Sequence, residues 1–150
     1  MPKARAEQRE PRRFDRAGLL ALAPRALGML FDMSRQEASF RVEKNGYAVV
    51  SVCGPLMQEP GWWFDSYPEV QARVAAALQS SALAVVLEIN SPGGEVGGCF
   101  EMARDLRAMA DAAKKPLIAY VDGTTASAAY AIACACDAIF APDTALVGSV

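Results

Sequence analysis

The sequence contains no histidine, and this absence removes several catalytic and metal-binding arrangements. A Ser-His-Asp triad, a Cys-His pair and every zinc site that uses imidazole are excluded. The four cysteines show no metal-ligand spacing, so we expect reduced thiols in the core, with no metal and no other cofactor. A serine hydrolase built on this chain therefore needs another general base, and lysine is the usual substitute.

Long apolar runs and a strong excess of one charge are also missing. No run approaches the roughly 18 apolar residues of a membrane span, and the apolar segment 19–27 is interrupted by Pro24 and Arg25. We therefore expect a cytoplasmic protein with no membrane span. The net charge of −2 argues against a nucleic-acid partner.

The charge is nevertheless unevenly distributed along the chain. Residues 1–40 carry 8 basic and 5 acidic side chains, whereas residues 41–150 carry 7 and 12. We interpret residues 1–39 as a basic arm with a short helix, either solvated or in contact with an acidic partner. An apolar share of 53% is ample for one packed domain, which we place at residues 40–150.

Strand-like and helix-like patterns alternate within this domain. The expected elements are a hairpin at 40–52 that turns at Asn45-Gly46, a helix after the capping box Ser66-Tyr67-Pro68-Glu69, strands at 83–89, 117–121 and 138–140, and helices at 99–110 and 127–135. The nearly continuous apolar run at 83–89 is typical of a strand covered on both faces. This order predicts an α/β fold with a parallel sheet and crossover helices.

Residues 56–65 are interpreted as a loop, and this loop is unusually aromatic. It contains Trp62-Trp63-Phe64. We favour a cluster that covers the edge of the core, and the alternatives are the wall of a substrate groove or an oligomer contact.

Two distinctive segments follow neighbouring strands. They are Asn90-Ser91-Pro92-Gly93-Gly94 and the stretch from Asp122 to Ser127. In parallel sheets ligands bind beyond the carboxyl ends of the strands, so both segments fall at the binding edge. Paired glycines let backbone N–H groups turn outward, and a serine at a helix start is either an N-cap or a nucleophile beside an oxyanion site. Together, the two segments favour the nucleophile.

Four motifs of the domain resemble a known enzyme family. They are Asn90-Ser91-Pro92-Gly93-Gly94-Glu95-Val96, Lys115-Pro116, Ala126-Ser127-Ala128-Ala129-Tyr130-x-Ile132-Ala133 and Ala145-x-Val147-Gly148-Ser149-Val150. Over residues 40–150 they resemble the signal peptide peptidase A family of Ser–Lys peptidases, and most of all its phage prohead (capsid maturation) proteases. The resemblance implies a Clp protease/crotonase-like fold, a homo-oligomer and a protein or peptide substrate such as a capsid scaffold.

The resemblance also implies roles for single residues. Ser127 would be the nucleophile, and backbone N–H groups of Gly93 or Gly94 and of Ala128 would form the oxyanion hole. In single-domain members of the family the base lysine comes after the segment that begins at Ala145. None of the chain's lysines matches that motif (Lys3, Lys44, Lys114, Lys115). We therefore expect a domain truncated at its C-terminus, with little peptidase activity of its own.

Three other functions remain open at this stage. One is a membrane-type signal peptide peptidase, which the missing membrane span disfavours. Another is a non-catalytic assembly remnant of the same fold, which the missing lysine favours. The third is a crotonase-like acyl-CoA enzyme, which would not need Ser127 at the start of a helix.

Overall fold

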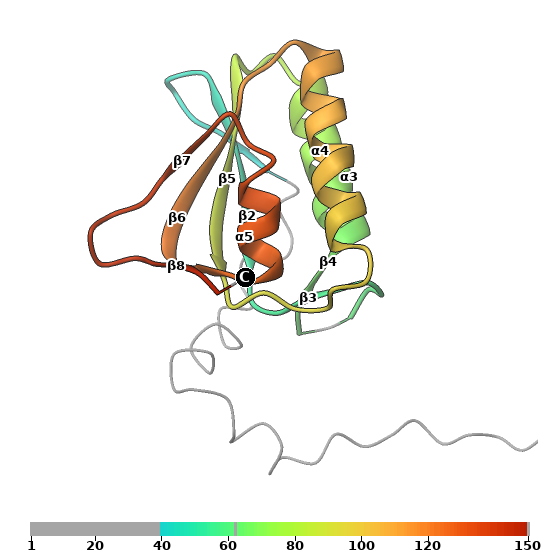
Figure 1. Ribbon diagram of the computed structural model, residues 1–150. Helices are drawn as coiled ribbons and strands as arrows, with labels where there is room; N and C mark the ends of the chain where they lie inside the picture. The colour runs from blue at the N-terminus through green and yellow to red at the C-terminus, as the bar shows by residue number, and fades with distance from the viewer. Residues whose placement is uncertain (1–39, 62, 150) are drawn as a thin grey trace, which may run out of the picture.

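The computed structural model describes residues 40–61 and 63–149 (Figure 1). The predicted arm and short helix of residues 1–39 lie outside this range, as does Trp62 of the aromatic loop. Within the described residues, strands and helices alternate along most of the chain, as the sequence pattern predicts.

The core of the fold is a six-stranded, mostly parallel sheet (Figure 1). In spatial order its strands are β1 (Arg41–Val42), β2 (Tyr47–Cys53), β5 (Ala84–Ser91), β6 (Leu117–Ala126) and β7 (Ala138–Phe140), with β8 (Leu146–Gly148) also paired to β6. Only β1 is antiparallel to its neighbour, and every other pairing in this sheet is parallel. The predicted hairpin and the predicted α/β class are both confirmed.

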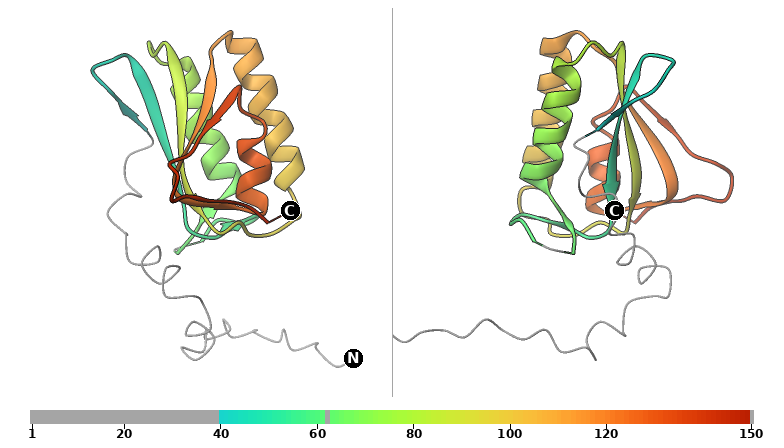
Figure 2. Two further views of the ribbon diagram at one scale, coloured as in Figure 1. Left: turned by 60° about the vertical axis from the view of Figure 1, so that its left-hand side comes forward. Right: turned by 180° about the vertical axis from the view of Figure 1, so that it is seen from behind.

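Three helices pack on this sheet, and all of them lie on the same face (Figure 2). They are α3 (Tyr67–Gln79), α4 (Cys99–Ala113) and α5 (Ala128–Ala133). The expectation of a sheet covered on both faces is therefore wrong for the described residues. On β5, Leu87 and Ile89 point into the helix-covered core, whereas Glu88 on the other face pairs with Arg41. The polar Glu88 within the apolar run was the sign that one face is open.

The start of α3 follows the predicted capping box. The Ser66 hydroxyl accepts a hydrogen bond from the Glu69 amide, and the Glu69 carboxylate accepts one from the Ser66 amide. Both bonds satisfy amides that the first turn of a helix leaves without partners. The apolar stripe that follows is buried as the helical spacing predicts, and it consists of Val70, Val74, Ala77 and Leu78.

The predicted loop at 56–65 contains two short strands instead. They are β3 (Leu56–Met57) and β4 (Asp65–Ser66), which pair in parallel, and Leu56 also bridges to Gly94. A two-residue strand is too short to show a hydrophobic period, so sequence reasoning could not find either. In the aromatic cluster, Phe64 is half-buried and packs on Gly61, while Trp63 is 56% exposed, so the interpretation as a cover for the core edge stays a prediction.

Strand β6 continues past its predicted end at Val121 to Ala126. The extension forms because its residues find partners on both sides. Thr125 pairs with Ser91 of β5, and residues 124–126 pair with β8. Helix α5 is correspondingly shorter than the predicted 127–135.

The four cysteines are reduced thiols, as expected, but they do not all lie in the core. Cys99 is buried, and Cys53 and Cys136 are half-buried. Cys134, at the C-cap of α5, is exposed, which corrects the prediction that all four lie in the core.

Candidate active site

The two distinctive segments meet at the carboxyl edge of the sheet. Gly93 adopts a φ of +93°, and a methyl group added to it would lie 2.7 Å from the Ser127 Cβ and 3.0 Å from the Ala128 nitrogen. Glycine is therefore required at this position for two reasons, the backbone conformation and the close approach of the neighbouring strand end. The sequence placed these segments at one edge, and the fold brings them into contact.

Ser127 has an unusual backbone conformation. Its φ is 52° and its ψ is −123°, which a non-glycine residue rarely adopts, and its side chain makes no capping hydrogen bond. The backbone is held in place because the Ser127 amide donates to the Gly148 carbonyl at 2.8 Å and its carbonyl accepts from Ala131 at 3.0 Å. Ser127 therefore occupies the N-cap position of α5, but its hydroxyl does not cap the helix. Such strain persists only where the surrounding structure enforces it, and it is concentrated at functional sites.

Backbone N–H groups on both sides of Ser127 have no acceptor among the described residues, and two of them bear on the candidate site. They belong to Ala128, the first residue of α5, and to Gly94. The Gly93 carbonyl accepts from the Leu56 amide at 3.0 Å, and the peptide bond is trans, so the Gly94 N–H points away from β3. The Gly93 amide itself donates to the Ser91 hydroxyl at 3.1 Å.

Residues 93–95, here called the glycine turn, are anchored on the side opposite Ser127. The Glu95 amide donates to the Leu56 carbonyl at 2.8 Å, and the Tyr67 hydroxyl donates to the Glu95 carbonyl. A Cβ on Gly94 would lie 1.7 Å from that same Leu56 oxygen. Leu56 and Tyr67 have no motif that would have marked them, because their role depends on long-range contacts.

A local irregularity directs the end of β6 toward the glycine turn. The β5–β6 register shifts between Ile89 and Ser91. The Asn90 side-chain oxygen accepts from the Thr124 amide at 3.2 Å, which supplies a partner where the ladder is interrupted. Such bulges often lie beside active sites and re-aim the chain. Asn90 and Ser91 were noted in the sequence only as parts of a motif, and their structural roles depend on contacts with Thr124 and Gly54 that the motif does not show.

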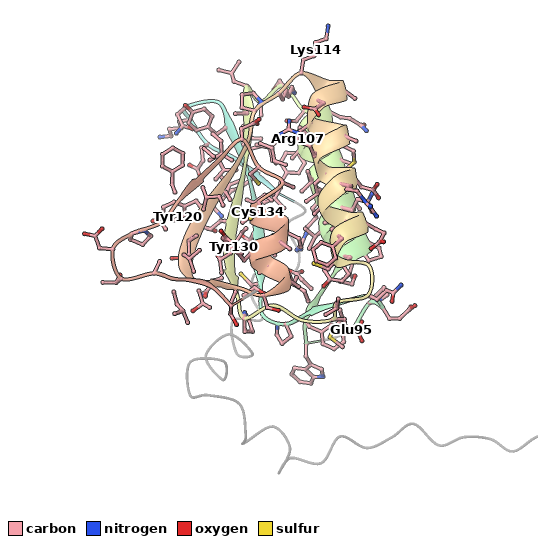
Figure 3. All side chains as sticks on the ribbon, in the orientation of Figure 1. Glu95, Arg107, Lys114, Tyr120, Tyr130 and Cys134 are labelled. Carbon is pink, nitrogen blue, oxygen red and sulfur yellow. The ribbon has the colours of Figure 1, made fainter. Side chains whose placement is uncertain are left out.

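The described lysines lie at the other end of the strands. Lys44 belongs to the β1–β2 turn, and Lys114 is the C-cap of α4. The Lys115 ammonium donates to the carbonyls of Leu78 and Ser80 at 2.8 and 2.6 Å. Figure 3 shows Lys114 at the opposite end of the molecule from Glu95, which adjoins the glycine turn. Strand β6 separates the two ends by about 30 Å at roughly 3.3 Å per residue.

Two further properties bear on cofactors and membranes. Within residues 40–61 and 63–149, no cluster of three or more carboxylate or thiol side chains could hold a metal ion. In the same part of the chain, no helix has the length and apolar character needed to cross a bilayer.

Tyr67 offers a test of how firmly the glycine turn is anchored. Burial raises the pKa of its phenol well above the ordinary value, so the hydroxyl stays protonated and keeps donating to the Glu95 carbonyl. Tyr67→Phe should lower the free energy of unfolding by about 1 kcal/mol. Because the pKa is raised in the folded state, this contribution is present in full below about pH 10 and is lost only as the pH rises through the folded-state pKa.

Urea unfolding of Tyr67→Phe at pH 6 and pH 9 checks this prediction. The exposed Tyr47 is the control, and Tyr47→Phe should leave stability unchanged. Equal stability of Tyr67→Phe and the unmodified protein would show that the hydroxyl does not hold the turn.

Comparison with known proteins shows similarity to peptidases. Residues 109–150 match the model of Peptidase family S49. A protein of Methanocaldococcus jannaschii, named only provisionally as a protease, is 41% identical over 70 residues, 47% of this chain and 22% of that protein. The capsid assembly protease C of Escherichia phage lambda is 31% identical over 136 residues, 87% of this chain and 30% of that protein.

A solved structure agrees with the fold. An enoyl-CoA hydratase/isomerase family member superimposes with a TM-score of 0.52 at 16% identity, covering 74% of this chain and 49% of that one. The fold is therefore crotonase-like, as predicted. The resemblance to Ser–Lys peptidases and their phage branch is also confirmed, and the chain spans less than a third of the length of the curated relatives it matches.

Proposed function

We propose that this chain carries the nucleophile and the oxyanion hole of a serine endopeptidase of the Ser–Lys type. The observation that carries the proposal is the contact between the Gly93 turn and the strained, half-buried Ser127. The amides of Gly94 and Ala128, which lack acceptors among the described residues, support an oxyanion hole beside this serine. Preorganised donors of this kind typically supply several kcal/mol of barrier reduction in acyl transfer.

The reaction follows from these roles. A lysine amine takes the proton of the Ser127 hydroxyl while the oxygen attacks a peptide carbonyl. The carbonyl oxygen becomes an anion and is stabilised by the amide of Ala128 and by a glycine amide. As the C–N bond breaks, the ammonium returns the proton to the leaving amine. Water then hydrolyses the ester, and the hydroxyl of Ser127 is regenerated.

An extended peptide fits the free edge of the glycine turn. Residues 93–95 already pair with Leu56 on one side, which leaves the N–H and C=O of Gly94 facing the other. A substrate strand that pairs with this edge gains affinity from backbone hydrogen bonds, whatever its sequence. The similarity to a capsid assembly protease favours a capsid or scaffold precursor as substrate, cleaved in the host cytoplasm or in the prohead by a homo-oligomer.

The proposed mechanism needs a general-base lysine other than the three lysines that the structure describes. Lys44, Lys114 and Lys115 lie at the amino ends of the strands, whereas Ser127 follows the carboxyl end of β6. A lysine outside residues 40–61 and 63–149, or one from another subunit, would therefore have to approach Ser127. If the base is absent from this chain, a small free amine should substitute for it.

Amine rescue of Ser127 labelling tests the proposed function. The purified chain is incubated with a fluorophosphonate, with and without n-propylamine, at fixed pH and ionic strength, and intact mass and peptide mapping report the adduct. We expect slow labelling of Ser127 alone, accelerated at least about tenfold by the amine, a fraction of what a positioned base supplies. Ser127→Ala is the control for the labelled site.

The other outcomes are equally informative. Fast labelling without amine would show that a base is already present, and a dependence of the rate on protein concentration would assign it to another copy of the chain. No labelling under any condition would contradict the peptidase proposal and favour a non-catalytic assembly protein of the same fold.

A further inference from the structure

We propose that Ser91 is a positioning residue that sets the orientation of the oxyanion hole. This inference rests on the proposed function, because it assigns a role within the same site. Ser91 does not face the position of a substrate, and its side chain is completely buried. Its effect on catalysis would be exerted through the glycine turn.

The Ser91 hydroxyl uses both of its hydrogen-bonding capacities. It donates to the Gly54 carbonyl at 2.7 Å and accepts from the Gly93 amide at 3.1 Å. Gly54 follows the carboxyl end of β2, and Ser91 ends β5. The hydroxyl therefore ties the glycine turn to the ends of two central strands, which are held in register along their length.

The bond to Gly93 has a direct consequence for the candidate site. With its own N–H held by Ser91, Gly93 presents its Cα to Ser127 and leaves the next amide, that of Gly94, free of an acceptor among the described residues. Loss of the Ser91 hydroxyl would leave a buried carbonyl and a buried amide without partners, and such groups rotate to find new ones. A turn that rotates here moves the oxyanion donors relative to the nucleophile.

Catalysis is more sensitive to such a movement than binding is. A displacement of about 1 Å in a catalytic group can lower a rate by about a hundredfold. The extended peptide edge, in contrast, depends on backbone pairing along several residues. The inference therefore predicts a loss in the rate of bond formation with a smaller loss in affinity.

Two substitutions and a matched control test this in the amine-rescued labelling reaction, carried out with a fluorophosphonate attached to an extended peptide. Ser91→Ala should lower the maximal labelling rate by about tenfold to a hundredfold, with the half-saturating probe concentration changed less than about threefold. Ser91→Thr, which keeps the hydroxyl, should recover most of the rate. Ser51→Ala removes another strand hydroxyl, which bonds to Glu88 on the open face, and should label like the unmodified protein.

Amide hydrogen exchange of the unmodified protein is a second test, and it requires neither labelling activity nor a stable variant. The Gly93 amide should exchange at least about tenfold more slowly than those of Gly94 and Ala128, because only Gly93 has an acceptor. Exchange of Gly93 as fast as that of Gly94 would overturn the inference, as would equal labelling rates for Ser91→Ala and the unmodified protein. If Ser127 of the unmodified protein is never labelled, the proposed function fails. Slow exchange of the Gly93 amide would even then support its hydrogen bond to the Ser91 hydroxyl.

Discussion

Replacing Gly94 with alanine is expected to prevent stable folding or to cost more than about 4 kcal/mol of unfolding free energy. A Cβ at this position would lie 1.7 Å from the Leu56 carbonyl oxygen and 2.5 Å from the Leu56 carbonyl carbon. Both atoms belong to a backbone that is paired with Gly93 and Glu95 on either side, so neither can move aside without breaking those bonds. The added methyl group therefore forces the glycine turn away from β3.

Gly148→Ala provides the control for this substitution. Gly148 has a φ of +125°, but a Cβ there would meet no atom of residues 40–61 and 63–149 within 4 Å. Its expected loss is about 1–2 kcal/mol, from backbone strain alone. The unfolding free energies of both variants are compared from urea unfolding curves, fitted with one common dependence of free energy on urea concentration. A Gly94→Ala protein as stable as Gly148→Ala would mean that β3 does not hold the glycine turn.

The second large effect concerns Ser127, where activity and stability should change in opposite directions. Ser127→Ala and Ser127→Gly should both abolish amine-rescued labelling. The glycine variant should exceed the alanine variant in unfolding free energy by about 1 kcal/mol, because relief of strain of about 1–3 kcal/mol outweighs the entropy that glycine loses on folding. The reason is the φ of 52° and ψ of −123° that the surrounding structure imposes on a non-glycine residue.

Lys114→Gly separates strain relief from function. Lys114 also has a positive φ, 54°, but it lies at the C-cap of α4 near the other end of the strands. We expect this variant to be stabilised while Ser127 labels at an unchanged rate. If Ser127→Gly were less stable than Ser127→Ala, the backbone at Ser127 would not be strained, and its geometry would carry no argument for function.

Much of the fold could be predicted because its signals are local. The capping box at Ser66 and the buried stripe that begins at Val70 both depend on contacts within one helix. The alternation of apolar runs with helical spacing predicted a parallel α/β sheet, and the short turn at Asn45-Gly46 predicted the hairpin. Such patterns follow from the period of each element and need no knowledge of the neighbours.

The errors arose where distant residues decide the local structure. Strand β6 extends to Ala126 because β5 and β8 offer it partners, and β3 forms because it pairs with β4. The open face of the sheet was missed because the nearly continuous apolar run at 83–89 was interpreted as a strand covered on both faces, although it contains Glu88. Its pairing with Arg41, 47 positions away, shows that it lies on an exposed face.

The sequence by itself determined which residues could form the site. The absence of histidine excluded His-based triads, the paired glycines after one strand and the serine after the next favoured a serine nucleophile, and the carboxyl-edge rule placed both segments together. Only the tertiary structure decided the backbone geometry of Ser127, which amides near it lack acceptors, and how far the described lysines lie from it. These properties depend on hydrogen bonds between residues far apart in the chain, such as Ser91 to Gly54 and Leu56 to Gly93, and no local pattern encodes them.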